Sequence, residues 1–503
     1  MSSKRPPWRK IFWALAAAVL AAHLLNAWIC SRTALPDFPK YFLNSDLYAN
    51  WLWSQNILEQ GWWDVKPYHP YTDWMQEIAP YDQWVKWWQG EVIFQHSPLY
   101  VYLLALWLKS GAGLAGFYFA QAVVAAALCV VLGRIAAAVC EDERAGVLAI
   151  ALAGAYGPFY GYAVALLRDL LGWTITAASI WSLVAWCRQT RRGIPTPGVS
   201  LTAGLLLGVG VLARETFYLI LPVAAYVLAA KCRDLREYRP LLFFIFGILA
   251  GVSPLLIRNA VAGAPVFSSS TRFAENFIEG NAPGAKPAAF AIPPDMGIIL
   301  RRADGDSWRV VRETFHVYDG HKSSWIGLQI RKAAALFDPY EAPDNLSLYY
   351  LGEITPFVRF GLPHWLLIVP GLGGLALALR RRDRRHAWLG IFGIVLAASV
   401  ALGPILSRYR QALAVLWIPW AASFLLVLFD AARANQKKRL GWGAALTILG
   451  WLLCLGPLRV RNPDSYFRAT EYRLAAKIYD LRGDRARATQ VLENLYKKGQ
   501  SSR

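Results

Sequence analysis

The chain has 503 residues, of which 56% are hydrophobic, and a mean hydropathy of +0.31. Soluble domains rarely reach this value, so the composition excludes an ordinary soluble protein and indicates an integral membrane protein. The net charge is +20. Lys and Arg occur in short clusters beside apolar stretches, which is typical of cytoplasmic loops and argues against nucleic acid as a partner. None of the six cysteines forms a C-x-x-C pair, so no disulfide framework or zinc site is predicted.

Apolar segments that are long enough, or nearly long enough, to cross a bilayer recur along the chain. We expect about 11 transmembrane helices. They lie near 11–29, 114–139, 145–163, 170–187, 199–213, 216–230, 240–257, 362–379, 387–405, 409–429 and 439–457. The first segment follows a basic stretch without a clean small-residue cleavage site, which favours an uncleaved span over a signal peptide. The predicted fold class is an all-α polytopic membrane protein.

The short apolar stretch 98–108 decides the topology. It is too short to cross the hydrocarbon core, so we expect an interfacial helix there. The basic clusters then all face the cytoplasm, whereas a crossing 98–108 would move nearly all of them outside, against the positive-inside rule. These clusters are Arg144, Arg188 with Arg191 and Arg192, Lys231 with Arg233 and Arg236, Arg380 to Arg382 with Arg384 and Arg385, and Lys437 to Arg439.

Three segments then face the outside of the plasma membrane. The loop 30–97 is rich in tryptophan and is expected to lie on the membrane, with an amphipathic helix over 50–58. The proline-broken loop 258–361 is too long for an unstructured connector. We assign 1–457 to one transmembrane domain. In the tail 458–503, two short helices resemble a single tetratricopeptide unit, which cannot bury its own apolar face and is expected to pack on the membrane domain or on a partner.

Two carboxylates stand at the ends of apolar segments. Asp46 lies in the first outside loop, and Asp169 lies at the junction of two later spans. Ionisable groups near hydrocarbon are costly and mark functional sites. Because the predicted topology places both acids on one face of the membrane, it points to chemistry at the bilayer surface on a lipid-borne substrate.

The order of several motifs resembles the GT-C superfamily of lipid-phosphate-sugar-dependent glycosyltransferases. That group includes the protein O-mannosyltransferases and the lipid A aminoarabinose transferases. The motifs are Asp46 with Tyr48, His96-Ser97-Pro98-Leu99-Tyr100, Arg168-Asp169, Gly204 to Arg214, Arg258-Asn259 through Asn276 to Pro283, Pro343-Asp344-Asn345, Tyr349-Tyr350 and Ser407-Arg408-Tyr409-Arg410. The resemblance covers most of residues 10 to 430.

This resemblance implies an inverting transfer of a sugar from an undecaprenyl- or dolichyl-phosphate donor to an acceptor hydroxyl on the outer membrane face. The acceptor is a protein, a lipid or a glycan of the cell envelope. It also implies catalytic roles for Asp46 and Asp169. A carboxylate can take the acceptor proton, and arginines match the oxygens of a departing phosphate. The expected phosphate ligands are His96, Arg168, Arg214, Arg258, Arg408 and Arg410. We expect that the reaction requires no cofactor, and a requirement for a divalent metal is left open.

Two residues depart from the pattern of these families. Leu47 stands where a second acid is frequent, and His96 stands where the relatives carry a permanent cation. Because histidine titrates near neutral pH, the departure predicts that contact with the lipid phosphate depends on pH.

Each assignment has a structural alternative. Asp46 can cap a helix over 47–58, and Asp169 can pair with Arg168 or cap the span 170–187. Arg214 and Glu215 can form a local salt bridge in a turn. Arg408 and Arg410 can extend to lipid headgroups, and His96 can be an ordinary interfacial histidine. His316 and His321 flank Asp319, a pattern that is more often solvated than metal-binding.

Two other classes of protein compete with a glycosyltransferase. A transporter or flippase of lipid-linked saccharides predicts polar residues in mid-span and repeated halves, and the sequence shows few mid-span charges and no such repeat. A non-catalytic membrane scaffold would use the tail 458–503 as its interaction module.

Overall fold

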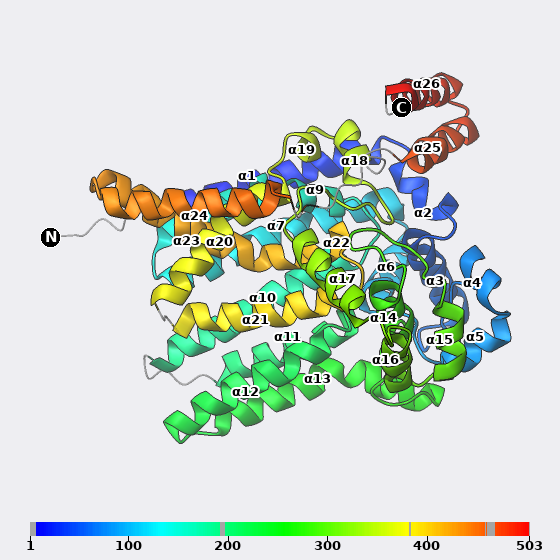
Figure 1. Cartoon of the computed structure of the whole chain (residues 1–503), viewed down its shortest axis with the longest axis horizontal. Helices are drawn as coiled ribbons and strands as arrows, with labels where there is room; N and C mark the ends of the chain where they lie inside the picture. Colours follow the sequence, from blue (N-terminus) through cyan, green and yellow to red (C-terminus); the bar gives the residue numbers. More distant parts are fainter. Residues whose placement is uncertain (1–6, 192–196, 382–383, 458, 460–467, 502–503) are drawn as a thin grey trace.

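The computed structural model describes residues 7–191, 197–381, 384–457, 459 and 468–501. Within these ranges the chain is built from helices and contains no β-strand, as the predicted fold class requires. Arg192 and Arg382 of the predicted basic clusters lie outside the described residues. Long helices run side by side through the body of the molecule, and short helices gather at one end of it (Figure 1).

The long helices coincide with the predicted spans. They are α1 (Trp8–Ser31), α7 (Gly113–Cys140), α8 (Glu143–Ala155), α10 (Asp169–Arg191), α11 (Pro197–Ala213), α12 (Phe217–Leu235), α13 (Arg239–Ala262), α20 (His364–Arg381), α21 (Arg384–Ala401), α23 (Ala414–Arg433) and α24 (Lys437–Leu455). Among the described residues, 5 helical segments are long and apolar enough to cross a membrane: Trp8–Ser31, Gly113–Cys140, Asp169–Gln189, Arg239–Ala262 and Ser407–Arg433. Crossing by the shorter helices stays a prediction.

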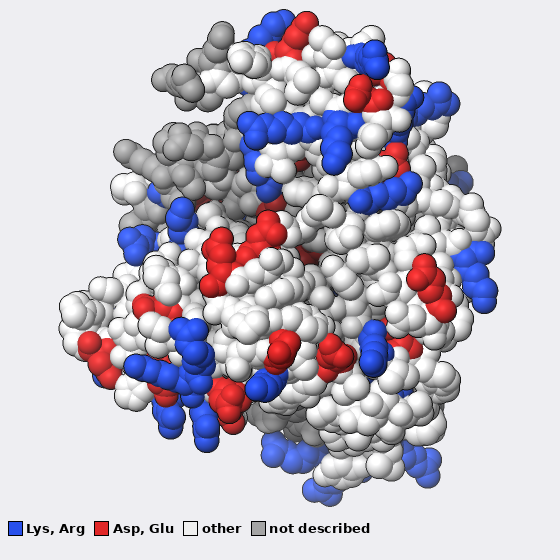
Figure 2. Space-filling view, turned by 90° about the vertical axis from the view of Figure 1, so that its right-hand side faces the viewer, with Lys and Arg blue, Asp and Glu red and all other residues white. Residues whose placement is uncertain are grey.

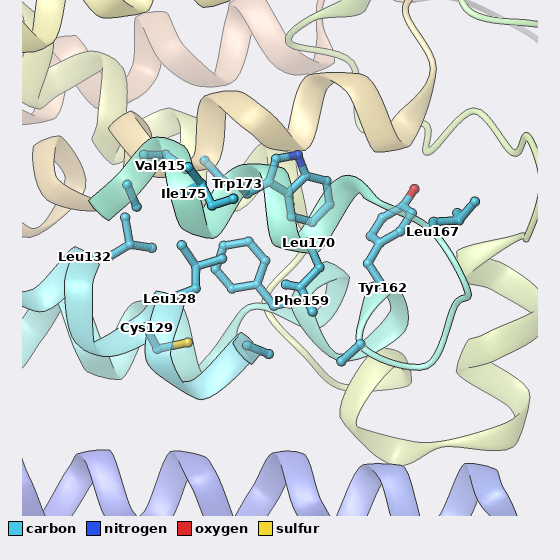
Figure 3. Packing of buried hydrophobic residues seen from close by; sticks show 14 of the residues in the cluster. Leu128, Cys129, Leu132, Phe159, Tyr162, Leu167, Leu170, Trp173, Ile175 and Val415 are labelled. Atoms are coloured by element: carbon cyan, nitrogen blue, oxygen red, sulfur yellow. The ribbon is translucent and has the colours of Figure 1, made fainter. Parts of the chain in front are cut away.

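One predicted span is interrupted. The stretch 145–163 divides at Tyr156 into α8 and the short α9 (Gly157–Tyr162), with Pro158 in the first turn of α9. Proline lacks the N–H group that would continue the hydrogen bonds of α8, so the chain changes direction here. The rings of Phe159 and Tyr162 of α9 then lie 6.0 and 5.2 Å from the ring of Trp173 of α10, in the buried cluster with Leu128 and Leu132 of α7 that Figure 3 shows.

Glycines allow α11 and α13 to approach each other closely. A Cβ atom added at Gly204 would lie 2.0 Å from the carbonyl oxygen of Phe244, and one at Gly251 would lie 2.5 Å from that of Leu205. Small residues at such contacts let two helix backbones meet directly, which is the usual way helices associate in lipid.

The short helices gather at one end of the bundle, which we call the loop end, and α1 begins near the opposite end (Figure 1). The first group is α2 (Phe38–Tyr41), α3 (Asp46–Gln60), α4 (Asp73–Ile78), α5 (Tyr81–Trp87) and α6 (Leu99–Lys109). The second is α14 (Phe273–Asn281), α15 (Met296–Ala303), α16 (Ser307–His316), α17 (Lys322–Ala335), α18 (Leu348–Ile354) and α19 (Pro356–Arg359). The predicted short helix over 98–108 corresponds to α6. Figure 2 looks onto the loop end, where basic and acidic side chains are interspersed.

The tryptophans of the first loop serve two purposes. Trp84, Trp87 and Trp88 are buried in a cluster that includes Ile278 of α14 and Ile299 of α15. Trp62 and Trp63 remain exposed, so only part of the aromatic surface of this loop is free to contact a membrane. The second half of this loop forms a core with the second loop, and contact of the loop with the bilayer stays a prediction.

The tail forms two helices, α25 (Ala469–Leu481) and α26 (Arg485–Ser501), joined at Gly483 and Asp484. Its apolar face, including Ala475 and Ile478, is buried in the same core cluster as the membrane helices. Arg482 forms an ion pair with Asp37 at 2.6 Å. The tail is thus packed on the loop end of the molecule itself.

Candidate active site

The first turn of α3 presents Asp46 without using it as a cap. The Oγ atom of Ser45 accepts a hydrogen bond from the backbone N–H of Tyr48 at 3.2 Å, so Ser45 is the capping residue. The backbone N–H of Asp46 donates to Oδ1 of Asn345 at 2.6 Å. The capping alternative for Asp46 is therefore wrong, and its carboxylate is available to other partners.

Arg408 joins three carboxylates from distant parts of the chain. Its Nη1 lies 2.6 Å from Oδ2 of Asp46. Its Nε lies 2.6 Å from Oδ2 of Asp344, and Nη1 is 3.9 Å from Oδ2 of Asp169. Nη2 donates to the hydroxyl of Tyr409 at 3.0 Å. Asp46 and Asp169, which the sequence predicted to share a face, are thus brought to one guanidinium group.

Two adjacent acid–base pairs lie next to this centre. Nη1 of Arg168 lies 2.8 Å from Oε1 of Glu215, and Nη1 of Arg214 lies 2.6 Å from Oδ1 of Asp169. The same Glu215 oxygen accepts the backbone N–H of Ser97 at 2.9 Å. Asp169 therefore does not pair with its neighbour Arg168, and Arg214 does not pair with its neighbour Glu215. The two dipeptides pair with each other, which fixes the start of α10 against the turn between α11 and α12.

His96 lies beside Asp46 and is buried. Its Nε2 is 3.8 Å from Oδ1 of Asp46. Burial lowers the pKa of His96 most, nearby Arg168 lowers it further, and Asp46 raises it in part, so that the pKa stays well below 6.5. The imidazole is therefore neutral near neutral pH. Among the described residues, His96 lines neither of the two cavities that are described in the following paragraphs.

Two predicted phosphate ligands are used elsewhere. Arg258 donates to the carbonyl oxygens of Val92 at 2.6 Å and of Asp64, and its guanidinium lies 3.9 Å from the ring centre of Phe94. Arg410 donates to the carbonyl oxygens of Ala335, Asp338 and Tyr340, at 3.0, 2.6 and 2.7 Å, and pairs with Glu341 at 3.0 Å. Both are buried. These donors hold loops together in the structure, and a role of Arg258 and Arg410 in phosphate binding stays a prediction.

Two cavities meet at the loop end. The first has a volume of about 700 Å³ and contains polar groups of both signs: Asp46, Arg272, Glu279, Asp344, Arg408 and Arg468. The second, of about 450 Å³, is lined by Arg168, Arg214 and Glu215 and by apolar residues such as Leu219, Phe273, Leu396 and Val400. Arg272, Asn276 and Tyr409 line both cavities and mark their junction.

The carboxyl groups of the first cavity differ in their preferred charge. Burial raises the pKa of Asp46, but the guanidinium groups of Arg408 and Arg272 lower it by more, so Asp46 is held ionised below its usual range. Burial and the neighbouring Asp46 raise the pKa of Asp344, although Arg408 lowers it. Burial raises the pKa of Glu279 to about 8 in spite of Arg272. A site with both ionised and neutral carboxyls can accept protons and donate hydrogen bonds.

Several lining residues were missed as site residues by the sequence reasoning. Asp344, Asn276 and Glu279 belong to stretches that resembled the superfamily, and Tyr409 stands between two predicted ligands. Arg272 lies inside the resembling stretch that begins at Arg258, and Arg468 had no sequence signal. In the ranges that the structure describes, no group of three or more His, Cys, Asp or Glu residues is arranged to hold a metal ion. His316 instead lies 2.7 Å from Asp319 in an exposed pair.

The family model described as dolichyl-phosphate-mannose-protein mannosyltransferase matches residues 95–257. Over this stretch, the predicted resemblance to the protein O-mannosyltransferases is confirmed. The matched stretch contains His96, Arg168, Asp169 and Arg214, and Asp46 and Arg408 lie outside it. No curated protein matches the chain.

Solved structures of the Archaeoglobus fulgidus oligosaccharyltransferase are similar over most of this chain. The apo form is 15% identical with a TM-score of 0.47, covering 90% of this chain and 56% of that one. A complex with an inhibitory peptide and a dolichol-phosphate is 15% identical with a TM-score of 0.42, covering 90% and 55%. A complex with Zn and sulfate is 16% identical with a TM-score of 0.41, covering 88% and 52%. The chain spans little more than half the length of these proteins.

Proposed function

We propose that this chain is a membrane glycosyltransferase that moves a sugar from a polyprenyl-phosphate donor to an acceptor hydroxyl on the outer face of the membrane. The observation that carries the proposal is the convergence of Asp46 and Asp169 on Arg408, at 2.6 and 3.9 Å, beside the junction of a polar and an apolar cavity. A lipid-linked sugar needs both kinds of cavity, because one part of the substrate is apolar and the other is polyhydroxylated.

The second cavity suits the lipid and its phosphate. Its apolar lining can receive the first isoprene units, and its arginines Arg168 and Arg214 lie with Arg272 at the polar end. Arginine offers a planar set of donors that matches phosphate oxygens, and fixed cations stabilise the charge that a departing phosphate gains. We therefore place the donor phosphate at the junction, with the sugar in the first cavity.

Asp46 is the proposed general base. In the transfer, the acceptor oxygen forms a bond to the anomeric carbon while its proton passes to the Asp46 carboxylate. The bond between that carbon and the phosphate oxygen breaks, and polyprenyl phosphate leaves with the bonding electrons. Attack from the face opposite the phosphate gives inversion. Each base–proton transfer of this kind contributes about 10² to 10⁴ in rate.

Arg408 couples donor binding to the activity of this base. In the structure its guanidinium pairs with Asp46 and lowers the pKa of that carboxyl, which makes Asp46 a weak base. A donor phosphate competes for Arg408 and adds negative charge nearby, so it raises the proton affinity of Asp46 when the sugar is in place. Asp169 is proposed to orient Arg214, with which it pairs at 2.6 Å.

The test compares a phosphorylated lipid with its neutral parent. The purified protein is incubated with polyprenyl phosphate or with polyprenol of the same length, and bound lipid is measured by native mass spectrometry. We expect retention of polyprenyl phosphate and loss of this preference in Arg214→Ala. In membranes containing the native acceptor, a labelled polyprenyl-phosphate sugar should release polyprenyl phosphate. Equal retention of the two lipids by the wild-type protein would overturn the proposal.

A further inference from the structure

Glu279 is a buried carboxyl group at the wall of the first cavity that the proposed transfer does not use. It lies on α14, one turn after Glu275, and the two residues are 3% and 1% exposed. Oε1 of Glu275 accepts a hydrogen bond from the indole N–H of Trp88 at 2.9 Å. Within the part of the chain that the structure describes, Oε1 of Glu279 and Oε2 of Glu275 have no hydrogen-bond partner, and of the two residues it is Glu279 that lines the cavity. Because an unpaired buried oxygen is costly, a ligand in the cavity is its natural partner.

The position of Glu279 relative to the junction identifies which part of the donor it faces. Arg272 and Asn276 line both cavities, and Glu279 follows them on the same face of the helix. Among the described residues, Glu279 lines the first cavity and not the second. A phosphate held at the junction therefore leaves Glu279 on the side of the sugar, about one helical turn away.

The surroundings of Glu279 keep its carboxyl group neutral at neutral pH. Burial raises its pKa most, Arg272 lowers it, and Glu275, Asp344 and Asp46 raise it again, to about 8. Arg408 and Arg468 are the other cations on the described cavity wall. A neutral carboxyl has one O–H donor and one carbonyl acceptor, which fits a pair of neighbouring sugar hydroxyls and does not fit a cationic group.

We propose that Glu279 binds hydroxyl groups of the donor sugar through its carboxyl group, an inference that rests on the proposed function. The matched control residue is Glu275, which is equally buried on the same helix but is absent from the described lining of the cavity.

The test measures binding of polyprenyl phosphate alone and of polyprenyl phosphate linked to mannose, glucose or galactose. Wild type should bind at least one sugar-linked lipid more tightly than the bare phosphate. Glu279→Ala should weaken that ligand about tenfold, the usual cost of one good hydrogen bond, and leave the bare phosphate unchanged. Glu279→Gln keeps a donor and an acceptor, so its affinity for the sugar-linked lipid should stay within about threefold of that of wild type. Glu275→Gln should change the affinities for the sugar-linked lipid and for the bare phosphate by the same factor.

A pH series distinguishes a neutral from an ionised role. Affinity for the sugar-linked lipid should be constant up to about pH 7 and weaken above about pH 8 in wild type, because Glu279 then ionises, and Glu279→Gln should remove this change. The inference is overturned if Glu279→Ala weakens both ligands equally, if no sugar-linked lipid is preferred, or if Glu279→Gln loses as much as Glu279→Ala. Failure of wild type to bind polyprenyl phosphate would instead overturn the proposed function.

Discussion

Asp46→Asn tests the proposed base directly. The substitution keeps the size of the side chain and one oxygen acceptor, but it removes the negative charge that takes the acceptor proton. A general base accounts for about 10² to 10⁴ in rate, which corresponds to about 3 to 5 kcal/mol of activation free energy. We therefore expect turnover to fall by about 10²-fold or more.

The same substitution should leave the fold intact. Arg408 keeps Asp344 as a partner at 2.6 Å and Asp169 at 3.9 Å, so no cation is left alone. Loss of one partly exposed charged hydrogen bond should lower the free energy of unfolding by about 1.5 kcal/mol. Affinity for polyprenyl phosphate should be equal or higher, because one carboxylate no longer competes for Arg408.

The assay measures release of polyprenyl phosphate from a labelled donor in membranes that hold the native acceptor, with melting temperature and lipid binding measured on the purified protein. Asp344→Asn is the matched control, since Asp344 also lies 2.6 Å from Arg408. It should keep turnover within about tenfold, because an orienting contact contributes less than proton transfer. Near-normal turnover in a well-folded Asp46→Asn protein would refute the assignment of the base.

Three further predictions concern His96, the tail and the topology. Because burial and Arg168 keep the pKa of His96 below its ordinary value, affinity for polyprenyl phosphate should change with pH between about 6 and 8 in the same way in wild type and His96→Ala; an affinity that falls through neutrality only in wild type would restore His96 as a phosphate ligand. Arg468 lines the first cavity and donates to the carbonyl oxygen of Asp344, so Arg468→Ala should raise the KM for the donor severalfold. Arg482→Ala, which removes the tail anchor at Asp37 and at the carbonyl oxygen of Thr33, should lower the melting temperature and leave KM unchanged; equal KM values in the two variants would contradict this role for Arg468. Cysteine labels at 140–144 and 380–386 should react from the cytoplasmic side, and labelling from outside at either position would refute the predicted topology.

Local sequence patterns were sufficient for the helices and for some of the site. Apolar runs predicted the long helices because burying apolar side chains in lipid requires them at every turn of a crossing helix. Asp46 and Asp169 were recognised because a carboxylate beside hydrocarbon is costly and therefore rare. The interruption of 145–163 at Tyr156 was missed, although Pro158 carried the signal.

The sequence by itself determined that this is an all-helical membrane protein with two acids at segment ends, because hydropathy and charge placement are local properties. Only the tertiary structure decided which cation serves which partner. Arginines at segment ends look alike in sequence, yet Arg408 joins three carboxylates whereas Arg410 is enclosed by backbone carbonyls. Arg468, from the far end of the chain, reaches the cavity because the tail packs on the loop end. Long-range packing sets these pairings, and no local pattern of residues encodes it.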